Sequence, residues 1–208
     1  MYLPEHFSET SPDRIAALIA DHSLGMLVTA PSGLPFASHL PFLFDQAAGP
    51  KGTLLAHMAR ANEQWQHLSA GSEVLVVFQG PHAYVSPTWY ASTGVPTWNY
   101  AVVHLRGKAR LIESGQELET LLKRLTQIHE AHQPSLWQPE QDEARRAQLL
   151  GMIVGCAIEV TQIQAKFKLS QNRPPADQRN VMAHLGASGN AAEAAVAQLM
   201  AEVLKNVE

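Results

Sequence analysis

The chain has 208 residues, of which 46% are hydrophobic and 16% are charged, a balance typical of one folded domain with a sizeable core. The net charge of −4 argues against a general nucleic-acid-binding surface, because such surfaces are usually basic. The single cysteine, Cys156, excludes an internal disulfide, and no apolar run reaches the roughly 18–20 residues of a membrane span. The first seven residues also lack a signal-peptide pattern, so a cytoplasmic location is expected.

The first predicted element is a helix from Ser11 to about His22. Ser11 is a favoured N-cap residue, and Pro12 and Asp13 suit the first helical turn. After this helix the apolar pattern becomes typical of strands, with Pro31-Ser32-Gly33 as a turn. Strands are predicted over residues 24–30, 35–44, 53–58 and 74–79, and a short helix capped by Asn62 over residues 62–70.

Residues 97–111 show the clearest alternation in the chain. The odd-numbered residues from Asn99 to Leu111 are small or apolar, and the even-numbered ones are aromatic, basic or otherwise bulky. A long strand with small residues on one side favours a curved barrel wall. Ser114 and Glu117 then form a capping box for a helix with a leucine stripe. A polar helix at about 140–150 and a strand at about 152–164 follow.

Two further helices are predicted after Pro174, over about 175–185 and 191–205, and Asn190 caps the second. The order of elements is not an alternation of single strands and helices, so it favours an antiparallel sheet. We therefore predict an α+β fold that is mainly β, a small barrel with inserted and C-terminal helices. Residues 1–185 are expected to form the barrel domain, and residues 186–208 a helical extension.

Residues 166–174 hold an unusual density of hydrogen-bond donors at the end of the last strand. Three cations, Lys166, Lys168 and Arg173, accompany the side chains of Ser170, Gln171 and Asn172. Such a segment beside a helix start is suited to an anionic ligand such as a phosphorylated cofactor. The alternative interpretation is a solvated connection between a strand and a helix.

A second cluster runs from His57 to Trp65, at the end of the third predicted strand. Arg60 precedes the helix capped by Asn62, so a phosphate there would meet a guanidinium and the free N–H groups of a helix end. The alternative is a surface arginine beside an ordinary N-cap.

Aromatic residues form the remaining clusters, in the extended segment after a turn predicted at Gly80-Pro81 and at the start of the alternating strand. Such rings could stack against a planar heterocycle, or form the core of a dimer interface. The residues are Tyr84, Trp89, Tyr90, Trp98 and Tyr100.

Other chemistries have less support. No dinucleotide-binding, Walker or nucleophile-elbow pattern occurs. His129 and His132 are three residues apart, which is not the spacing of a zincin helix, so no metal site is predicted. Cys156 lies among apolar strand residues and is expected to be buried and inert. The basic stripe Arg106, Lys108 and Arg110 is interpreted as a solvated edge, with an anion or nucleic-acid surface as the alternative.

Together these clusters resemble the PaiB-type family of FMN-binding negative transcriptional regulators, within the FMN-binding split-barrel superfamily. The resemblance covers residues 1 to about 185. Glu63 stands where the family usually has proline, Thr88 where it usually has serine, and the segment between Tyr90 and Val95 is shorter. The segments that carry the resemblance are 1–7, 57–65, 77–90, 96–100 and 166–174.

The resemblance implies a six-stranded split barrel and a homodimer that binds one FMN per site at the subunit interface. Ala59–Asn62 would grip the flavin phosphate, and residues of the first two strands would lie near the ring. Trp98 or the segment Lys168–Asn172 would reach the flavin from the partner chain. The implied cofactor contacts are Thr29, His39, Leu40, His57, Ala59, Arg60, Ala61, Asn62, Trp98, Lys168, Gln171 and Asn172.

Three functions follow as expectations. The first is a dimeric FMN-binding protein with a negative regulatory or redox-sensing role in transcription. The second is a flavin-dependent oxidoreductase of the pyridoxamine-phosphate-oxidase-like type, although no residue is identified as a required acid or base. The third is direct DNA binding, which has little support because no helix carries clustered lysines or arginines, so any regulation is expected to be indirect.

Overall fold

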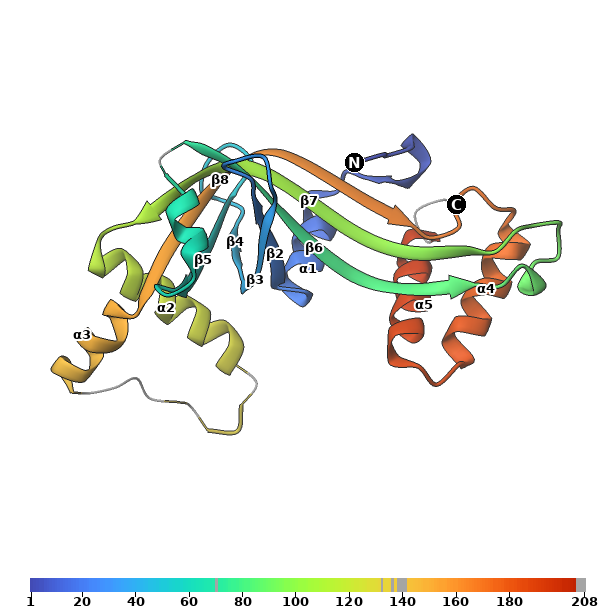
Figure 1. The fold of residues 1–208 in the computed structure, drawn as a ribbon. Helices are drawn as coiled ribbons and strands as arrows, with labels where there is room; N and C mark the ends of the chain where they lie inside the picture. Colours follow the sequence, from blue (N-terminus) through green and yellow to red (C-terminus); the bar gives the residue numbers. More distant parts are fainter. Residues whose placement is uncertain (70, 132, 136, 138–141, 205–208) are drawn as a thin grey trace. The chain divides into compact units, whose positions relative to one another are not determined.

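The computed structural model divides the chain into two compact units (Figure 1). It describes residues 1–69, 71–131, 133–135, 137 and 142–204. The first unit comprises Met1–His22, Phe78–His104 and Gln164–Glu208, and the second comprises Ser23–Val77 and Leu105–Ile163. Three long strands contribute residues to both units: β6 (Ser72–Val85), β7 (Thr97–Ile112) and β8 (Ile153–Lys168).

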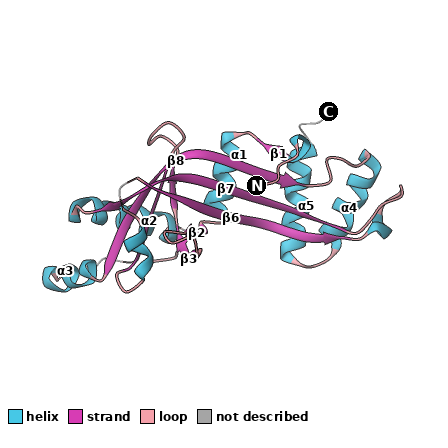
Figure 2. Cartoon of the chain, turned by 45° about the horizontal axis from the view of Figure 1, so that its top comes forward, coloured by secondary structure: helices cyan, strands magenta, loops and turns pink. Residues whose placement is uncertain are grey.

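The second unit is built on antiparallel strands. Strands β2 (Leu24–Thr29), β3 (Phe36–Pro41), β4 (Leu43–Asp45) and β5 (Thr53–Ala59) join the three long strands in the order β3-β2-β6-β7-β8-β5-β4. The pairs β2–β3, β2–β6, β4–β5 and β5–β8 are antiparallel. In Figure 2 the strands are magenta, and β6, β7 and β8 run side by side.

Strand alternation puts one face of this sheet in the core. On β5, Leu54, Ala56 and Met58 are buried, whereas Leu55 faces the opposite side. That opposite side packs against α2 (Gly115–Glu130), which begins at the predicted N-cap Ser114. The residues that form the core beneath α2 are Ile112, Leu118, Leu121, Leu125 and Ala157.

Helix α3 (Glu143–Gly151) follows α2 and leads directly into β8. The carboxylate of Asp142 caps this helix by accepting from the backbone N–H of Arg145 at 2.7 Å. The helix has no buried residue and exposes Leu149, so it lies on the surface of its unit with part of its apolar side uncovered.

The first unit packs helices against its own portions of the long strands. Its elements are η1 (Glu5–Phe7), β1 (Ser8–Glu9), α1 (Pro12–Asp21), η3 (Pro87–Trp89), α4 (Pro175–Ala187) and α5 (Ala191–Leu204). Strand β1 pairs with β8, with Ser8 opposite Lys166, and α4 packs against α5. Ser11 caps α1 and Asn190 caps α5, as predicted. The buried apolar residues include Ile19, Phe167, Leu185 and Met200.

The alternation predicted for residues 97–111 is confirmed, since the side chains of Asn99, Ala101, Val103 and Leu105 are buried and those of Arg106, Lys108 and Arg110 are exposed. Gly107 also lies on the buried face. A Cβ atom at this position would lie 2.5 Å from the backbone oxygen of Glu159 and 2.6 Å from Cγ2 of Ile158. The close approach of β7 to β8 therefore requires glycine here.

Several boundaries differ from prediction. The turn predicted at Gly80-Pro81 is wrong, because both residues lie within β6; a Cβ atom on Gly80 would meet Leu18 and Ala101, so close packing explains the glycine. The strand predicted over 35–44 is two strands, separated at the buried Phe42. Strand β8 continues four residues beyond Gln164.

The helix predicted over 62–70 is only a short 3₁₀ helix, η2 (Glu63–His67), with Asn62 as its N-cap. Ala70, Lys205 and His132 lie outside the described residues. The fold is the expected one of strands with helices inserted after β7 and appended after β8.

Candidate functional site

Arg60 lies just beyond β5, with its side chain exposed and directed along the junction between α3 and β8. Its Nε donates to the carbonyl of Gly151 at 2.9 Å, and its Nη2 donates to the carbonyl of Ile153 at 3.2 Å. Its backbone N–H donates to the carbonyl of Met152 at 2.8 Å. Within the described part of the chain nothing accepts a hydrogen bond from Nη1. The guanidinium is thus fixed in direction yet retains donors for an external anion.

Trp65 holds the chain at Arg60 from the other side. Its Nε1 donates to the carbonyl of Arg60 at 2.9 Å, and the centre of its ring lies 5.9 Å from the Arg60 Cζ atom, within the range of a cation–π contact. The chain from Arg60 to Trp65 thus folds back so that Trp65 contacts Arg60. These contacts limit the orientations that the backbone of Arg60 can adopt.

A buried amide network attaches this segment to β2 and β3. The Nε2 atom of Gln64 donates to the carbonyls of Leu27 and Phe36 and to Oγ1 of Thr29, each at 3.1 Å. The Oγ1 atom of Thr29 also lies 2.9 Å from Nδ1 of His67. The Thr29 hydroxyl, predicted to lie near a flavin ring, is therefore part of an internal network.

Asn62 has two roles in the same network. Its Oδ1 accepts from the backbone N–H of Gln64 at 3.1 Å, and its Nδ2 donates to Ser38 Oγ at 2.9 Å. Because η2 has only five residues and the N–H of its second residue, Gln64, is engaged by Asn62, the predicted phosphate site at a full helix end is not formed. An anion here would depend on Arg60 and the backbone of Ala59–Asn62, without the dipole of a long helix.

His39 and Leu40 lie on opposite faces of β3. His39 is exposed and pairs in register with Met26, whereas Leu40 is 6% exposed and belongs to the core. Because neighbouring residues of a strand point to opposite faces, a single flat ring cannot contact both side chains. His39 has the side chain that is open to a ligand.

His57 shares with Leu55 the face of β5 that packs against α2. It pairs in register with Gly155 of β8, and its Nδ1 atom is buried with no hydrogen-bond partner among the described residues. Burial lowers the pKa of the His57 imidazole below its ordinary value, because a charged ring would lose hydration.

We expect His57 to make the free energy of unfolding depend on pH below about 6.5, the ordinary pKa of histidine. The unfolded chain takes up a proton there, while the folded chain does so only at a lower pH. Stability is therefore complete above about pH 6.5 and is lost as the pH falls toward the lowered pKa. Urea unfolding between pH 7 and pH 5 should show a shallower pH dependence for His57→Leu than for the wild type.

His39→Leu, at an exposed position of β3, is the matched control and should keep the wild-type dependence. An identical pH dependence for His57→Leu and the wild type would contradict the burial of a neutral imidazole.

In the first unit, Lys168 is bound to its own chain. Its Nζ donates to Thr97 Oγ1 at 2.7 Å and to the carbonyl of Trp98 at 2.6 Å. Burial lowers the pKa of Lys168, and the neighbouring positive charges of Lys166 and Arg173 lower it further. Lys166, Lys168 and Arg173 therefore lie close enough to influence one another, and positive charge gathers at the end of β8 as predicted.

Gln171 and Asn172 differ in accessibility. The Gln171 amide accepts from the N–H of Leu169 at 2.7 Å and also donates to the Phe167 carbonyl, so it shapes its own turn. Asn172 is exposed. Ser170, between the end of β8 and Gln171, has a backbone φ of +67°. The buried Asn99 fixes it, because Asn99 Nδ2 donates to Ser170 Oγ at 3.0 Å.

The aromatic cluster separates into two groups within the first unit. Trp98 is 52% exposed, and its ring centre lies 6.0 Å from those of Tyr84 and His82. Trp89 instead stacks on His184 of α4 at 5.1 Å, and Tyr90 stacks with Arg173 at 4.0 Å. The first group lies on the face of β6 and β7 that Tyr100, two residues after Trp98, also shares.

Asp177 is a positioning residue that sequence reasoning did not identify. It is buried and accepts hydrogen bonds from the Ser92 hydroxyl and from the backbone N–H groups of Ser92 and Ala91. These hydrogen bonds hold the pKa of its carboxyl below the usual value. The segment after Trp89 is thus attached to α4. An acidic residue in a first helical turn gives no sign in the sequence of such a distant partner.

Cys156 is completely buried, as predicted, and burial raises the pKa of its thiol to about 12. The described residues contain no group of three or more metal-ligating side chains. No helix in the described ranges is both long and apolar enough to cross a membrane.

The predicted stripe of Arg106, Lys108 and Arg110 is exposed, and Arg110 pairs with Glu117 at 2.6 Å.

Comparison with solved structures shows the split-barrel fold. A FAD and heme binding protein from Mycobacterium smegmatis has a TM-score of 0.63 at 15% identity, covering 88% of this chain and 80% of that one. The flavocytochrome Anf3 from Azotobacter vinelandii has a TM-score of 0.60 at 14% identity, with coverage of 77% and 69%. The predicted fold class is confirmed.

Sequence comparison identifies the family. Protease synthase and sporulation protein PAI 2 of Bacillus subtilis is 40% identical over 207 residues, covering 99% of each chain. An uncharacterized protein of Emericella nidulans is 31% identical over 243 residues, covering 97% of each. Residues 1–162 match the family model described as "Putative FMN-binding domain". The resemblance inferred from the motifs is confirmed, and the chain belongs to this family of FMN-binding domains.

Proposed function

We propose that this protein is a homodimeric flavoprotein that binds FMN and uses it in a negative regulatory or redox-sensing role in transcription. The family supports a flavin, and PAI 2, whose name refers to protease synthesis and sporulation, is similar over 99% of its length. The observation that carries the choice of a phosphorylated flavin is the fixed, exposed guanidinium of Arg60.

The residues around Arg60 fit a phosphate group. The Nε and Nη2 atoms are engaged by the carbonyls of Gly151 and Ile153, which orient the planar group and leave Nη1 available. A preoriented guanidinium loses less side-chain entropy when it binds an anion than a mobile one. We therefore assign the FMN phosphate to Arg60 and the adjoining backbone of Ala59, Ala61 and Asn62.

For the flavin ring, His39 is the candidate contact from β3, because its side chain is exposed. Thr29 and Leu40 would support this part of the site from inside the protein. Thr29 does so through its hydrogen bond to Gln64, and Leu40 through its packing in the core. A bound flavin supplies hydride-transfer and electron-transfer chemistry, whereas these residues supply position and environment.

The homodimer is supported by apolar surface on the sheet of the second unit. Leu27 and Val76 point into the core, so their neighbours point to the opposite face. These neighbours are apolar and only half-buried, namely Met26, Val28, Leu75 and Val77. An open apolar sheet face of this kind is typical of a surface that another protein chain covers.

We propose that the partner chain also contributes the aromatic group of the first unit. Trp98 and Tyr84 are 52% and 44% exposed, which is high for large rings in contact with each other. Trp98 and the segment Lys168–Asn172 are therefore assigned to the flavin bound mainly by the other copy. Lys168 would supply positive charge, and Asn172 an accessible amide.

Direct DNA binding is not part of this proposal. The exposed stripe of β7 has one of its arginines, Arg110, paired with Glu117, and the net charge of the chain is −4. Regulation would then proceed through a partner protein or through the state of the flavin.

The test is a fluorescence titration of the purified flavin-free protein with FMN and, separately, with riboflavin, which lacks the phosphate. We expect saturation with FMN at micromolar concentration or below, and at least about tenfold weaker binding of riboflavin, because charge-assisted hydrogen bonds to phosphate are lost. Sedimentation equilibrium should give a dimer with one FMN per subunit.

Equal affinity for FMN and riboflavin, or no binding of either, would contradict the assignment of the phosphate to Arg60. A monomer at tens of micromolar would contradict the shared site. Bleaching of the bound flavin by NADPH or NADH would assign the protein to the oxidoreductases instead.

A further inference from the structure

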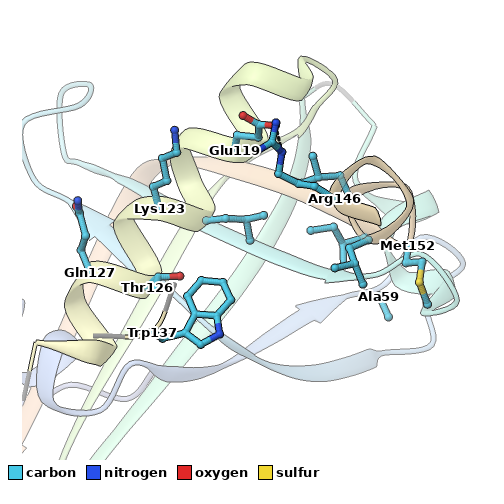
Figure 3. Close-up of a pocket in the computed structure, with 12 residues that line it drawn as sticks. Ala59, Glu119, Lys123, Thr126, Gln127, Trp137, Arg146 and Met152 are labelled. Carbon is cyan, nitrogen blue, oxygen red and sulfur yellow. Dashed lines mark ion pairs between the residues drawn. The ribbon is translucent and has the colours of Figure 1, made fainter. Parts of the chain in front are cut away.

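The second unit contains a cavity of about 680 Å³ that none of the proposed flavin contacts other than Ala59 lines. It lies between α2 and α3, beside the end of β5 and the start of β8 (Figure 3). Its volume is in the range of sites that hold drug-sized organic molecules. The residues that line it are Ala59, Glu119, Leu122, Lys123, Thr126, Gln127, Trp137, Arg146, Leu149, Leu150, Met152 and Ile153.

The walls of this cavity are predominantly apolar and open to solvent. Leu149 is 42% exposed and Met152 is 60% exposed, although both are large hydrophobic residues. Leu150 and Ile153 continue the same wall toward the core beneath α2. The α2–α3 cavity therefore offers a continuous apolar surface that a hydrophobic body would remove from water.

The rim of the cavity is polar and carries a net positive charge. Arg146 Nε lies 3.7 Å from Glu119 Oε1, a long ion pair whose side chains are 43% and 37% exposed. Lys123, one turn of α2 beyond Glu119, forms no ion pair with a described residue. Two cations and one carboxylate thus surround the opening, and all three side chains are labelled in Figure 3.

We propose that the α2–α3 cavity binds a small amphipathic organic acid, with an aromatic or alkyl body and a single carboxylate. The body would lie against Leu149 and Leu150, and the carboxylate would lie at the rim near Lys123 and Arg146. An apolar wall favours the body, and the charge complementarity favours the anion over a neutral or cationic molecule. This site adjoins the phosphate site at Arg60 and shares Ala59 with it, but other residues form its apolar wall and its charged rim.

The test is isothermal titration calorimetry with naphthoate, an aromatic carboxylate, and with naphthalenemethanol, its neutral counterpart. Both are titrated at pH 7 into the full-length protein, once without flavin and once saturated with FMN. We expect saturable binding of naphthoate with a Kd of about 0.1 mM, as is typical of a small ligand. The alcohol should bind about fivefold more weakly, and naphthoate should bind equally well in both preparations.

Three variants separate this site from non-specific binding. Lys123→Gln should weaken naphthoate about fivefold and leave the alcohol unchanged, whereas Lys108→Gln, an exposed lysine of β7 away from the cavity, should change neither. Leu149→Glu puts a carboxylate in the apolar wall at an exposed position, so it should weaken naphthoate at least about tenfold without unfolding the protein. Thermal melts of each variant check the fold.

The proposal is overturned if naphthoate shows no saturable binding up to about 5 mM, well above the affinity expected for a ligand of this size. It is also overturned if acid and alcohol bind equally, or if Leu149→Glu binds naphthoate as the wild type does. Competition between naphthoate and FMN would place the ligand in the flavin site instead. Dissociation of a dimer by Leu149→Glu, without naphthoate binding to the wild type, would assign the cavity to a protein interface.

Discussion

Arg60→Ala is expected to weaken FMN binding by about 30-fold while leaving the affinity for riboflavin within about twofold of the wild type. The arginine donates charge-assisted hydrogen bonds to phosphate, and each such bond is worth about 1.5–3 kcal/mol. Riboflavin has no phosphate, so it does not use this interaction. The measurement is a fluorescence titration of both flavins with the wild-type and variant proteins.

Two further variants separate the charge of Arg60 from its structural contacts. Arg60→Lys keeps the positive charge but cannot donate to the carbonyls of Gly151 and Ile153 in the same fork geometry, so it should recover only part of the FMN affinity. Arg110→Ala removes an exposed arginine paired with Glu117 and should leave both flavins unaffected. An equal loss of FMN and riboflavin affinity in Arg60→Ala would assign the residue a purely structural role.

Gly107→Ala is expected to lower the free energy of unfolding by about 3 kcal/mol, in the range of overpacked interiors. The added methyl group would lie 2.5 Å from the backbone oxygen of Glu159, and strand β8 cannot move away without breaking its pairing with β5. Urea unfolding followed by circular dichroism measures the change as a lower midpoint.

Gly115→Ala is the matched control for this substitution. Gly115 begins α2, and a Cβ atom at this position would meet no atom within 4 Å. Because alanine is the better helix former, this variant should be at least as stable as the wild type. A Gly107→Ala protein with wild-type stability would show that β7 and β8 are not packed as closely as described.

Local signals in the sequence predicted most elements well. The N-caps Ser11, Ser114 and Asn190 each begin a helix, because a side-chain oxygen that satisfies a free N–H acts within three residues. The alternation from Asn99 onward was equally informative, because burial on one side of a strand repeats every second residue.

The local sequence signals for turns and helices failed where contacts between residues distant in sequence override the local conformational preference. Gly80 and Pro81 are typical turn residues, yet β6 continues through them because Leu18 and Ala101 pack closely against the glycine. The helix after Asn62 ends early as the buried side chain of Gln64 turns toward β2 and β3. Local preference cannot anticipate such contacts.

The candidate site was predictable in its residue types but not in its connections. Arg60 was identified from the sequence, whereas its acceptors at Gly151 and Ile153 are 91 and 93 residues away. The hydroxyl of Thr29 and the amide of Gln171 were assigned to a ligand, yet both are engaged within the protein. A sequence shows which groups can form hydrogen bonds, but the fold decides which of them remain free.

The burial of Cys156 limits how this protein can respond to oxidants. Its thiol is completely buried and its pKa is raised to about 12, so almost no thiolate forms at neutral pH. Peroxides and disulfides react with the thiolate, and the chain has no second cysteine to resolve a sulfenic acid. Thiol oxidation at Cys156 is therefore disfavoured, and a response to oxidants through this residue is not expected.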